Sequence, residues 1–214
     1  MEKLPNVTVL DHPIIQHKVS LLRDKDLPCG AFRELVHEIS MLEGYEALRD
    51  LKTESRLVTS PIAPSMQPHV VARNLCFVPI LRAGLGMADG IAKLLPEARF
   101  GHIGLYRDEV THEPHEYYCK LPDNLSELKV YLVDPMLATG GSAIDAVKML
   151  RAHGAKDISF LCIIAAPEGV KAFSEKCPDI PLYICALDEK LNENAYIVPG
   201  LGDAGDRIFG TQKK

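Results

Sequence analysis

The clearest indication of chemistry lies in residues 130–142, where an apolar run ends in an acid and is followed by a small, hydroxyl-rich turn. The run predicts a buried strand, and residues 142–154 predict a helix. Residues 139–142 then stand at a helix N-terminus, where free N–H groups and the helix dipole favour an anion. Asp134 follows the strand, where a carboxylate suits a ribose diol or a hydrated divalent cation. The pattern predicts a phosphate site. The alternative is an ordinary Gly-Gly turn with a hydroxyl cap, which has the same sequence pattern.

A second strand-to-helix turn follows residues 75–80 and carries a cation, Arg82, beside Ala83 and Gly84. A guanidinium can hold two phosphate oxygens at once, so this turn is a candidate diphosphate site. The alternative interpretation is a glycine-rich helix start with a surface arginine.

Two further segments invite a chemical interpretation that we reject. Residues 107–118 contain His112 and His115 among several acids, but their spacing fits no closed metal site and is more typical of a solvated hairpin tip.

Residues 200–205 match the dinucleotide-binding string G-x-G-x-x-G. That fingerprint needs a strand before it, a helix after it and an acid about twenty residues on, whereas only nine residues follow here. On composition alone, a flexible C-terminal loop is the alternative.

The elements that must position these residues alternate between apolar strands and amphipathic helices from residue 75 onward. Such alternation predicts an α/β fold with a doubly wound, mostly parallel sheet, whose ligands bind at the carboxyl ends of the strands. The predicted strands are residues 75–80, 102–106, 130–133, 158–165 and 182–187, and the predicted helices are residues 86–95, 142–153 and 169–176.

The first 55 residues are predicted to be mostly helical, with helices over residues 13–22 and 31–51. Pro61, Pro64 and Pro68 then indicate a loop-like stretch that is either linker or edge structure.

Length and composition favour one soluble domain over residues 1–214. The formal net charge of −5 argues against a general nucleic-acid binder. We expect no membrane span and no signal peptide, because the apolar stretches are short and the first residues are polar. The six cysteines are scattered without a Cys-x-x-Cys pair, which indicates reduced thiols and a cytoplasmic location.

Residues 134–142, Asp-Pro-Met-Leu-Ala-Thr-Gly-Gly-Ser, resemble the phosphoribosyl-diphosphate (PRPP) motif of the type I phosphoribosyltransferases, in the form found in uracil phosphoribosyltransferases. Most relatives have two adjacent acids where this chain has Asp134 and Pro135. That difference fits the uracil branch and argues against the purine and orotate branches. The resemblance extends at least from residue 75 to the C-terminus, and it implies the type I phosphoribosyltransferase fold with an N-terminal helical extension over residues 1–55 and a β-hairpin arm over residues 107–120.

The resemblance also implies roles for individual residues. Asp134, Arg107 and Asp203 are expected to act in catalysis. The residues expected to bind PRPP are Arg82, Ala83, Gly84, Arg107, Asp134, Pro135, Met136, Leu137, Ala138, Thr139, Gly140, Gly141, Ser142 and Asp203.

Residues 196–207, called here the C-terminal segment, resemble the base-binding segment of the same family. Ile197, Gly202, Asp203 and Ala204 are expected to line the base. Uracil presents two carbonyl acceptors around one N–H donor, which an exposed glycine-rich backbone can match. Cytosine would set its amine against a backbone donor, and such mismatches reduce binding strongly.

The activity implied is the conversion of uracil and PRPP to UMP and diphosphate, a pyrimidine salvage step. Mg²⁺ is expected to arrive with PRPP, without direct protein ligands. The resemblance also implies a homodimer or homotetramer and a possible GTP effector. Two alternatives are the same chemistry on another base and an RNA-binding regulator that senses PRPP or UMP, against which the acidic charge balance argues.

Overall fold

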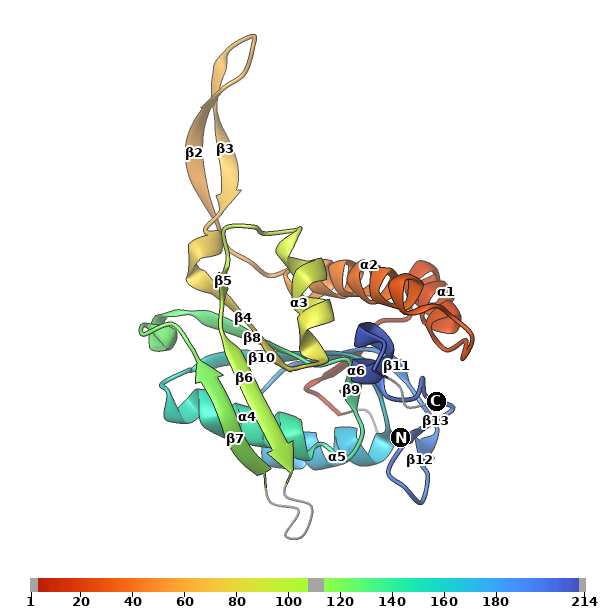
Figure 1. The fold of residues 1–214 in the computed structure, drawn as a ribbon. Coiled ribbons are helices and arrows are strands. Elements are labelled where there is room, and N and C mark those ends of the chain that lie inside the picture. The colour runs from red at the N-terminus through yellow and green to blue at the C-terminus, as the bar shows by residue number, and fades with distance from the viewer. Residues whose placement is uncertain (1–3, 108–113, 212–214) are drawn as a thin grey trace.

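A nine-stranded sheet forms the centre of the computed structural model, which describes residues 4–107 and 114–211, without the side chains of residues 107, 114 and 115 (Figure 1). Its main strand order is β1-β11-β10-β8-β4-β6-β7, with β5 paired to β4 and β9 paired to β10. The strands are β1 (Val7–Val9), β4 (Leu75–Leu81), β5 (Arg99–Phe100), β6 (His102–Arg107), β7 (Pro114–Lys120), β8 (Lys129–Val133), β9 (Met136–Leu137), β10 (Asp157–Ala165) and β11 (Leu182–Leu187).

The strands at the middle of the sheet pair in parallel. Val130 of β8 lies between Cys76 of β4 and Ile158 of β10. Residues of β10 after Asp157 are buried without interruption, which explains the continuous apolar run in the sequence. Within the described residues of this sheet, only β6 and β7 pair antiparallel. The carboxyl ends of β4, β8 and β10 therefore lie along one edge.

Helices cover both faces of the sheet, as the predicted doubly wound fold requires (Figure 1). One face packs against α1 (Pro13–Leu22), α2 (Cys29–Ala47), α3 (Gly84–Ala92) and α6 (Ala204–Phe209), and the other against α4 (Gly141–Ala152) and α5 (Pro167–Lys176). Short 3-10 turns span Ala72–Asn74 and Leu125–Glu127. The fold class predicted from the sequence is therefore confirmed.

The stretch rich in proline is a hairpin that extends away from the sheet (Figure 1). Its strands, β2 (Thr53–Thr59) and β3 (Pro64–Val70), pair antiparallel from Thr53↔Val70 to Thr59↔Pro64. The sequence did not distinguish between a linker and edge structure here, and the structure shows a two-stranded ribbon. Proline is tolerated there because each strand has a side that needs no ladder hydrogen bond.

Other elements also differ from the prediction. The first 55 residues, predicted to be mostly helical, contain α1 and α2 but also β1, which joins the sheet beside β11, and the start of β2 at Thr53. Helix α2 ends at Ala47 rather than at Leu51. The short strands β12 (Lys190–Leu191) and β13 (Ile197–Val198) and helix α6 were not predicted. Elements of two to six residues are too short to show a hydrophobic period.

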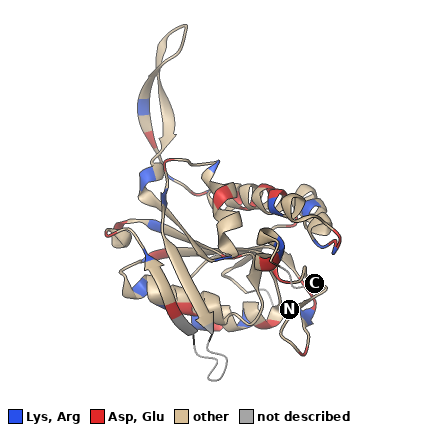
Figure 2. Ribbon diagram, in the orientation of Figure 1, with Lys and Arg blue, Asp and Glu red and all other residues tan. Residues whose placement is uncertain are grey.

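Acidic and basic side chains are interspersed along the helices (Figure 2). Within residues 4–107 and 114–211, no helix is both long and apolar enough to cross a membrane.

Gly169 of α5 supports the turn before α4 and generates a testable prediction. A Cβ at Gly169 would lie 2.3 Å from the Ala138 carbonyl oxygen and 2.7 Å from that of Leu137. We expect Gly169→Ala to lower the free energy of unfolding by about 1–3 kcal/mol, measured by urea denaturation. Gly30 of α2 has open space around its Cβ position, so Gly30→Ala should be neutral or stabilising by up to about 1 kcal/mol. Equal stability of the two variants would contradict this packing.

Candidate functional site

Two strand-to-helix turns lie side by side at the carboxyl edge of the sheet. β4 leads through residues 82–84, the arginine turn, into α3, and β8 leads through Asp134 and β9 to α4. Pro79 pairs with Val133, so both strands end at nearly the same level. A Cβ at Gly84 would lie 2.5 Å from the Val133 carbonyl oxygen, so only glycine allows this approach. The sheet therefore places the two candidate phosphate sites next to each other.

Residues 139–142, the phosphate turn, form the N-terminus of α4. Gly140 is the N-cap residue with φ of 86°, a left-handed conformation that glycine adopts readily. Among the described side chains none caps this helix end, which leaves its first N–H groups open to an anion. Thr139 is exposed and Ser142 half-buried, so hydroxyl groups are accessible beside those N–H groups. The turn has the form that phosphate binding requires, and its role remains a prediction.

Asp134 lies at the end of β8, as the sequence predicts. Its N–H donates to the Leu161 carbonyl at 3.2 Å, which fixes its backbone to β10. Loss of hydration, reinforced by the Asp203 carboxylate, raises the pKa of Asp134 to about 8. The structure thus brings together two acids that are 69 positions apart in the sequence. Pro135 is buried, and its carbonyl accepts from the Ile164 N–H at 3.0 Å.

The C-terminal segment lies across the edge from the phosphate turn. β13 pairs antiparallel with β12, the Val198–Pro199 peptide is cis, and Gly200 and Gly202 have positive φ. Asp203 is the N-cap of α6 and accepts from the Asp206 N–H at 2.8 Å. A cavity of about 220 Å³ opens between this segment and β9, lined by Met136, Ala138, Asn194, Ala195, Tyr196, Ile197, Gly202 and Asp203.

Some of the residues predicted to contact a base line this cavity, together with residues that were not predicted to do so. Ile197, Gly202 and Asp203 line it, whereas Ala204 is fully buried behind it. The sequence analysis missed the contribution of residues 194 and 195. Asn192 could have indicated this turn, because its side-chain oxygen accepts from the N–H groups of residues 194 and 196 at 3.0 and 2.9 Å.

The arginine turn contacts α6. Arg82 lies 3.5 Å from the Asp206 carboxylate, and its guanidinium is 5.6 Å from the centre of the Phe209 ring. The side chain of Arg82 is 56% exposed, which leaves it accessible to an anionic ligand. The Leu81–Arg82 peptide is cis. A Cβ at Gly205 would lie 3.7 Å from that of Ala83, so the start of α6 also packs near this turn.

The predicted arm, residues 107–120, is described only in part. β6 and β7 pair from His102↔Lys120 to Arg107↔Pro114 as an antiparallel hairpin. The Arg107 side chain lies outside the described residues, as does the tip that carries His112. In the part of the chain that the structure describes, no group of three or more His, Cys, Asp or Glu residues could hold a metal ion.

The fold, with two strand-to-helix turns side by side at one edge of a mostly parallel sheet, is that of the type I phosphoribosyltransferases. In fold, the chain is similar to the adenine phosphoribosyltransferase of Trypanosoma brucei, solved in complex with AMP, pyrophosphate and ribose-5-phosphate, with a TM-score of 0.60 and 16% identity over 95% of this chain and 90% of that one.

Sequence comparison is more specific. The profile of the uracil phosphoribosyltransferase family matches residues 9–211. Uracil phosphoribosyltransferases of Pediococcus pentosaceus and Symbiobacterium thermophilum are 60% and 56% identical, covering 95% and 98% of this chain and 98% and 100% of theirs. A solved structure from Aquifex aeolicus has a TM-score of 0.91 and 37% identity, covering 97% of this chain and all of that one. The chain belongs to the uracil phosphoribosyltransferase family and is an enzyme of the glycosyltransferase class.

The raised pKa of Asp134 predicts a pH-dependent stability. Between the ordinary carboxyl pKa and about 8, the folded protein keeps a proton that the unfolded chain releases, so stability from this group falls as pH rises through that range. Asparagine cannot ionise. Asp134→Asn should therefore have a Tm at least about 2 °C above that of the wild type near pH 9, and the two should converge only below about pH 4, where the carboxyl group is protonated in the folded and unfolded chains alike.

Asp179 provides a control of opposite sign, because a hydrogen bond from Arg151 lowers the pKa of its carboxyl. Asp179→Asn should gain no stability at high pH. Parallel Tm profiles for wild type and Asp134→Asn across this pH range would show that Asp134 is not held in its protonated form.

Proposed function

We propose that this chain transfers the 5-phosphoribosyl group of PRPP to uracil, giving UMP and diphosphate, at the carboxyl edge of its sheet. The observation that carries the proposal is the shared cavity. Met136 and Ala138, which precede the phosphate turn, line one side of it, and Ile197 and Gly202 line the other. The ribose 5-phosphate end and the base end of one nucleotide therefore have adjoining sites.

The base side of the cavity is suited to uracil because it includes the exposed backbone of Gly202. Gly202 has no side chain of its own over its peptide groups, which can offer a donor and an acceptor to the ring. The apolar side chain of Ile197 contacts the flat face of a base. Cytosine in the same position would leave a buried donor facing a donor.

The two turns divide the phosphates of PRPP between them. The N–H groups and hydroxyls of the phosphate turn receive the 5-phosphate, and Arg82 receives the diphosphate. Arg107 ends β6 on the same edge, since β4 and β6 pair in parallel from Ile80↔Ile103. Its guanidinium is assigned to the phosphates by family resemblance.

Displacement at the anomeric carbon develops positive charge on the ribose, so the enzyme acts mainly by placing charge. Asp134 binds the ribose hydroxyls and, when ionised, faces that developing charge. Because its pKa is raised by lost hydration and by Asp203, arrival of a cationic group favours the ionised form.

Mg²⁺ fits the donor set at this edge. Asp134 and Asp203 are close enough for one to raise the pKa of the other, and carboxylate oxygens are ligands that Mg²⁺ prefers. Because the resemblance implies no direct protein ligand, these two carboxylates would face the hydrated Mg²⁺ carried by PRPP, and the ion would offset the charge of the departing diphosphate. Pro135 supplies no side-chain ligand.

Three broader expectations stay predictions. A cytoplasmic location is supported by the six cysteines, all of which are free. Assembly into a homodimer or homotetramer and regulation by GTP rest on family resemblance alone.

A panel of bases tests the proposed function. The protein is incubated with PRPP, Mg²⁺ and uracil, cytosine, orotate or hypoxanthine, and nucleotide products are separated by chromatography. We expect UMP from uracil and far slower product formation from the other three bases. Asp134→Asn, with an intact fold by circular dichroism, should make UMP at least about 100-fold more slowly. Consumption of hypoxanthine alone would show that the base site is wrongly assigned, and near wild-type turnover by Asp134→Asn would remove that residue from the mechanism.

A further inference from the structure

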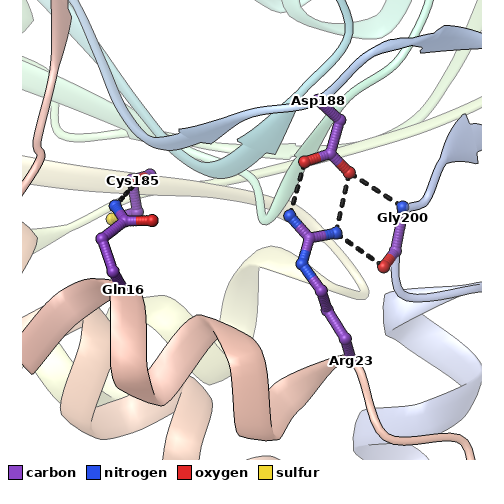
Figure 3. A network of polar contacts seen from close by, with 5 residues as sticks. All are labelled: Gln16, Arg23, Cys185, Asp188 and Gly200. Atoms are coloured by element: carbon purple, nitrogen blue, oxygen red, sulfur yellow. Dashed lines mark hydrogen bonds and ion pairs between the residues drawn. The ribbon is translucent and has the colours of Figure 1, made fainter.

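A partly buried ion pair holds one residue of the C-terminal segment from both sides (Figure 3). Arg23, just after α1, donates to the Asp188 carboxylate at 2.5 and 2.8 Å. The same guanidinium donates to the Gly200 carbonyl at 2.8 Å, and the Gly200 N–H donates to Asp188 at 2.8 Å. Arg23 and Asp188, called here the Gly200 clamp, therefore occupy both backbone groups of this residue.

The conformation of Gly200 leaves this segment little freedom. Its φ is 66°, and a Cβ there would lie 2.1 Å from the Ile197 carbonyl oxygen. A glycine-rich loop loses much conformational entropy when it is ordered, so fixed hydrogen bonds are needed to hold one arrangement. The Gly200 clamp supplies two of them, one to each of the peptide groups that flank the Gly200 Cα, and both come from charged side chains.

The Gly200 clamp is itself anchored to the sheet. Asp188 directly follows β11, its side chain is only 3% exposed, and its N–H donates to the Ala165 carbonyl at the end of β10 at 2.8 Å. On α1, Gln16 lies two turns before Arg23 and donates to the Cys185 carbonyl of β11 at 2.7 Å (Figure 3). Helix and strand therefore present the guanidinium and the carboxylate in fixed positions.

A second arginine holds the other end of the same loop. Arg207 of α6 donates to the carbonyls of Leu22 and Leu201, each at 2.9 Å, and to that of Asp24. Its guanidinium lies 4.2 Å from the centre of the Phe32 ring of α2. Both ends of the loop are therefore attached to the carboxyl end of α1.

We infer that Arg23 and Asp188 are positioning residues that determine base selection. Neither lines the 220 Å³ cavity, whereas Ile197 and Gly202, on either side of Gly200, do. The Gly200 clamp acts through the backbone, setting where the peptide groups of the loop face the base. This inference rests on the proposed function, because it takes that cavity to be the uracil site.

Arg23→Lys tests the inference. Lysine keeps the charge but cannot hold two carboxylate oxygens and a carbonyl in one plane. We expect KM for uracil to rise about tenfold, and the ratio of kcat/KM for uracil over cytosine to fall by about as much, as peptide groups move off their ideal positions. KM for PRPP should stay within about twofold, because the phosphate turn is built on α4. A merely structural role would change both KM values together.

Asp188→Asn gives a second variant, which keeps an acceptor for the Gly200 N–H but removes the ion pair. Asp188→Asn should also raise KM for uracil and lower the ratio of kcat/KM for uracil over cytosine. If Arg23→Lys does not fold, Asp188→Asn alone tests the role of the Gly200 clamp. The control is Arg151→Lys, which alters an exposed pair in which one guanidinium nitrogen donates to both carboxylate oxygens of Asp179. This variant should change neither KM nor base selection.

The two hypotheses fail in different ways. If the wild type makes no UMP from uracil, the proposed function is wrong. If the wild type makes UMP and the folded variants keep the wild-type KM for uracil and the wild-type preference over cytosine, the Gly200 clamp has no role in base selection and this inference is overturned.

Discussion

Strands β4, β8 and β10 pair in parallel, and this pairing decides where the polar side chains of the site can lie. Pro79 is opposite Val133, and Val133 is opposite Leu161, so the strands reach one edge in register. All three are buried on both faces, and a slip by one residue would exchange the side chains between the two cores. The pairing of these strands thus fixes the positions of Asp134 and the arginine turn relative to each other.

The loops that follow these strands complete the site, and some of them are held by segments that are distant in the sequence. The phosphate turn follows from β8 and α4, which are neighbours in sequence. The base side is different, because it is formed by residues near the C-terminus that are attached to α1 near the N-terminus. Arg23 and Asp188 are 165 positions apart, and Arg207 and Leu22 are 185 apart. The N-terminal helices therefore contribute to the architecture of the site.

Much of the sheet and part of the site could be predicted from sequence. Buried parallel strands are apolar throughout, so β4, β8, β10 and β11 were recognised from composition and spacing, and Asp134 was placed at a strand end for the same reason. The hairpin β2–β3 was not recognised, because proline is read as a break although a two-stranded ribbon accepts it.

Contacts between distant segments could not be predicted at all. A lone Arg23 or Asp188 has no local pattern that identifies its partner. The raised pKa of Asp134 depends first on lost hydration and then on Asp203, and only the folded chain supplies both. Single-sequence patterns report local periodicity and turn chemistry, whereas these interactions arise from tertiary packing.

The central claim is that one nucleotide spans the phosphate turn and the C-terminal segment across a shared cavity. The most direct measurement is a crystal structure of the protein with UMP. The account predicts the 5′-phosphate at the N–H groups of residues 139–142 and the uracil ring against Ile197 and Gly202, with its carbonyl and N–H groups bonded to backbone. A phosphate bound at another helix end, or a base outside the cavity between β9 and the C-terminal segment, would contradict it.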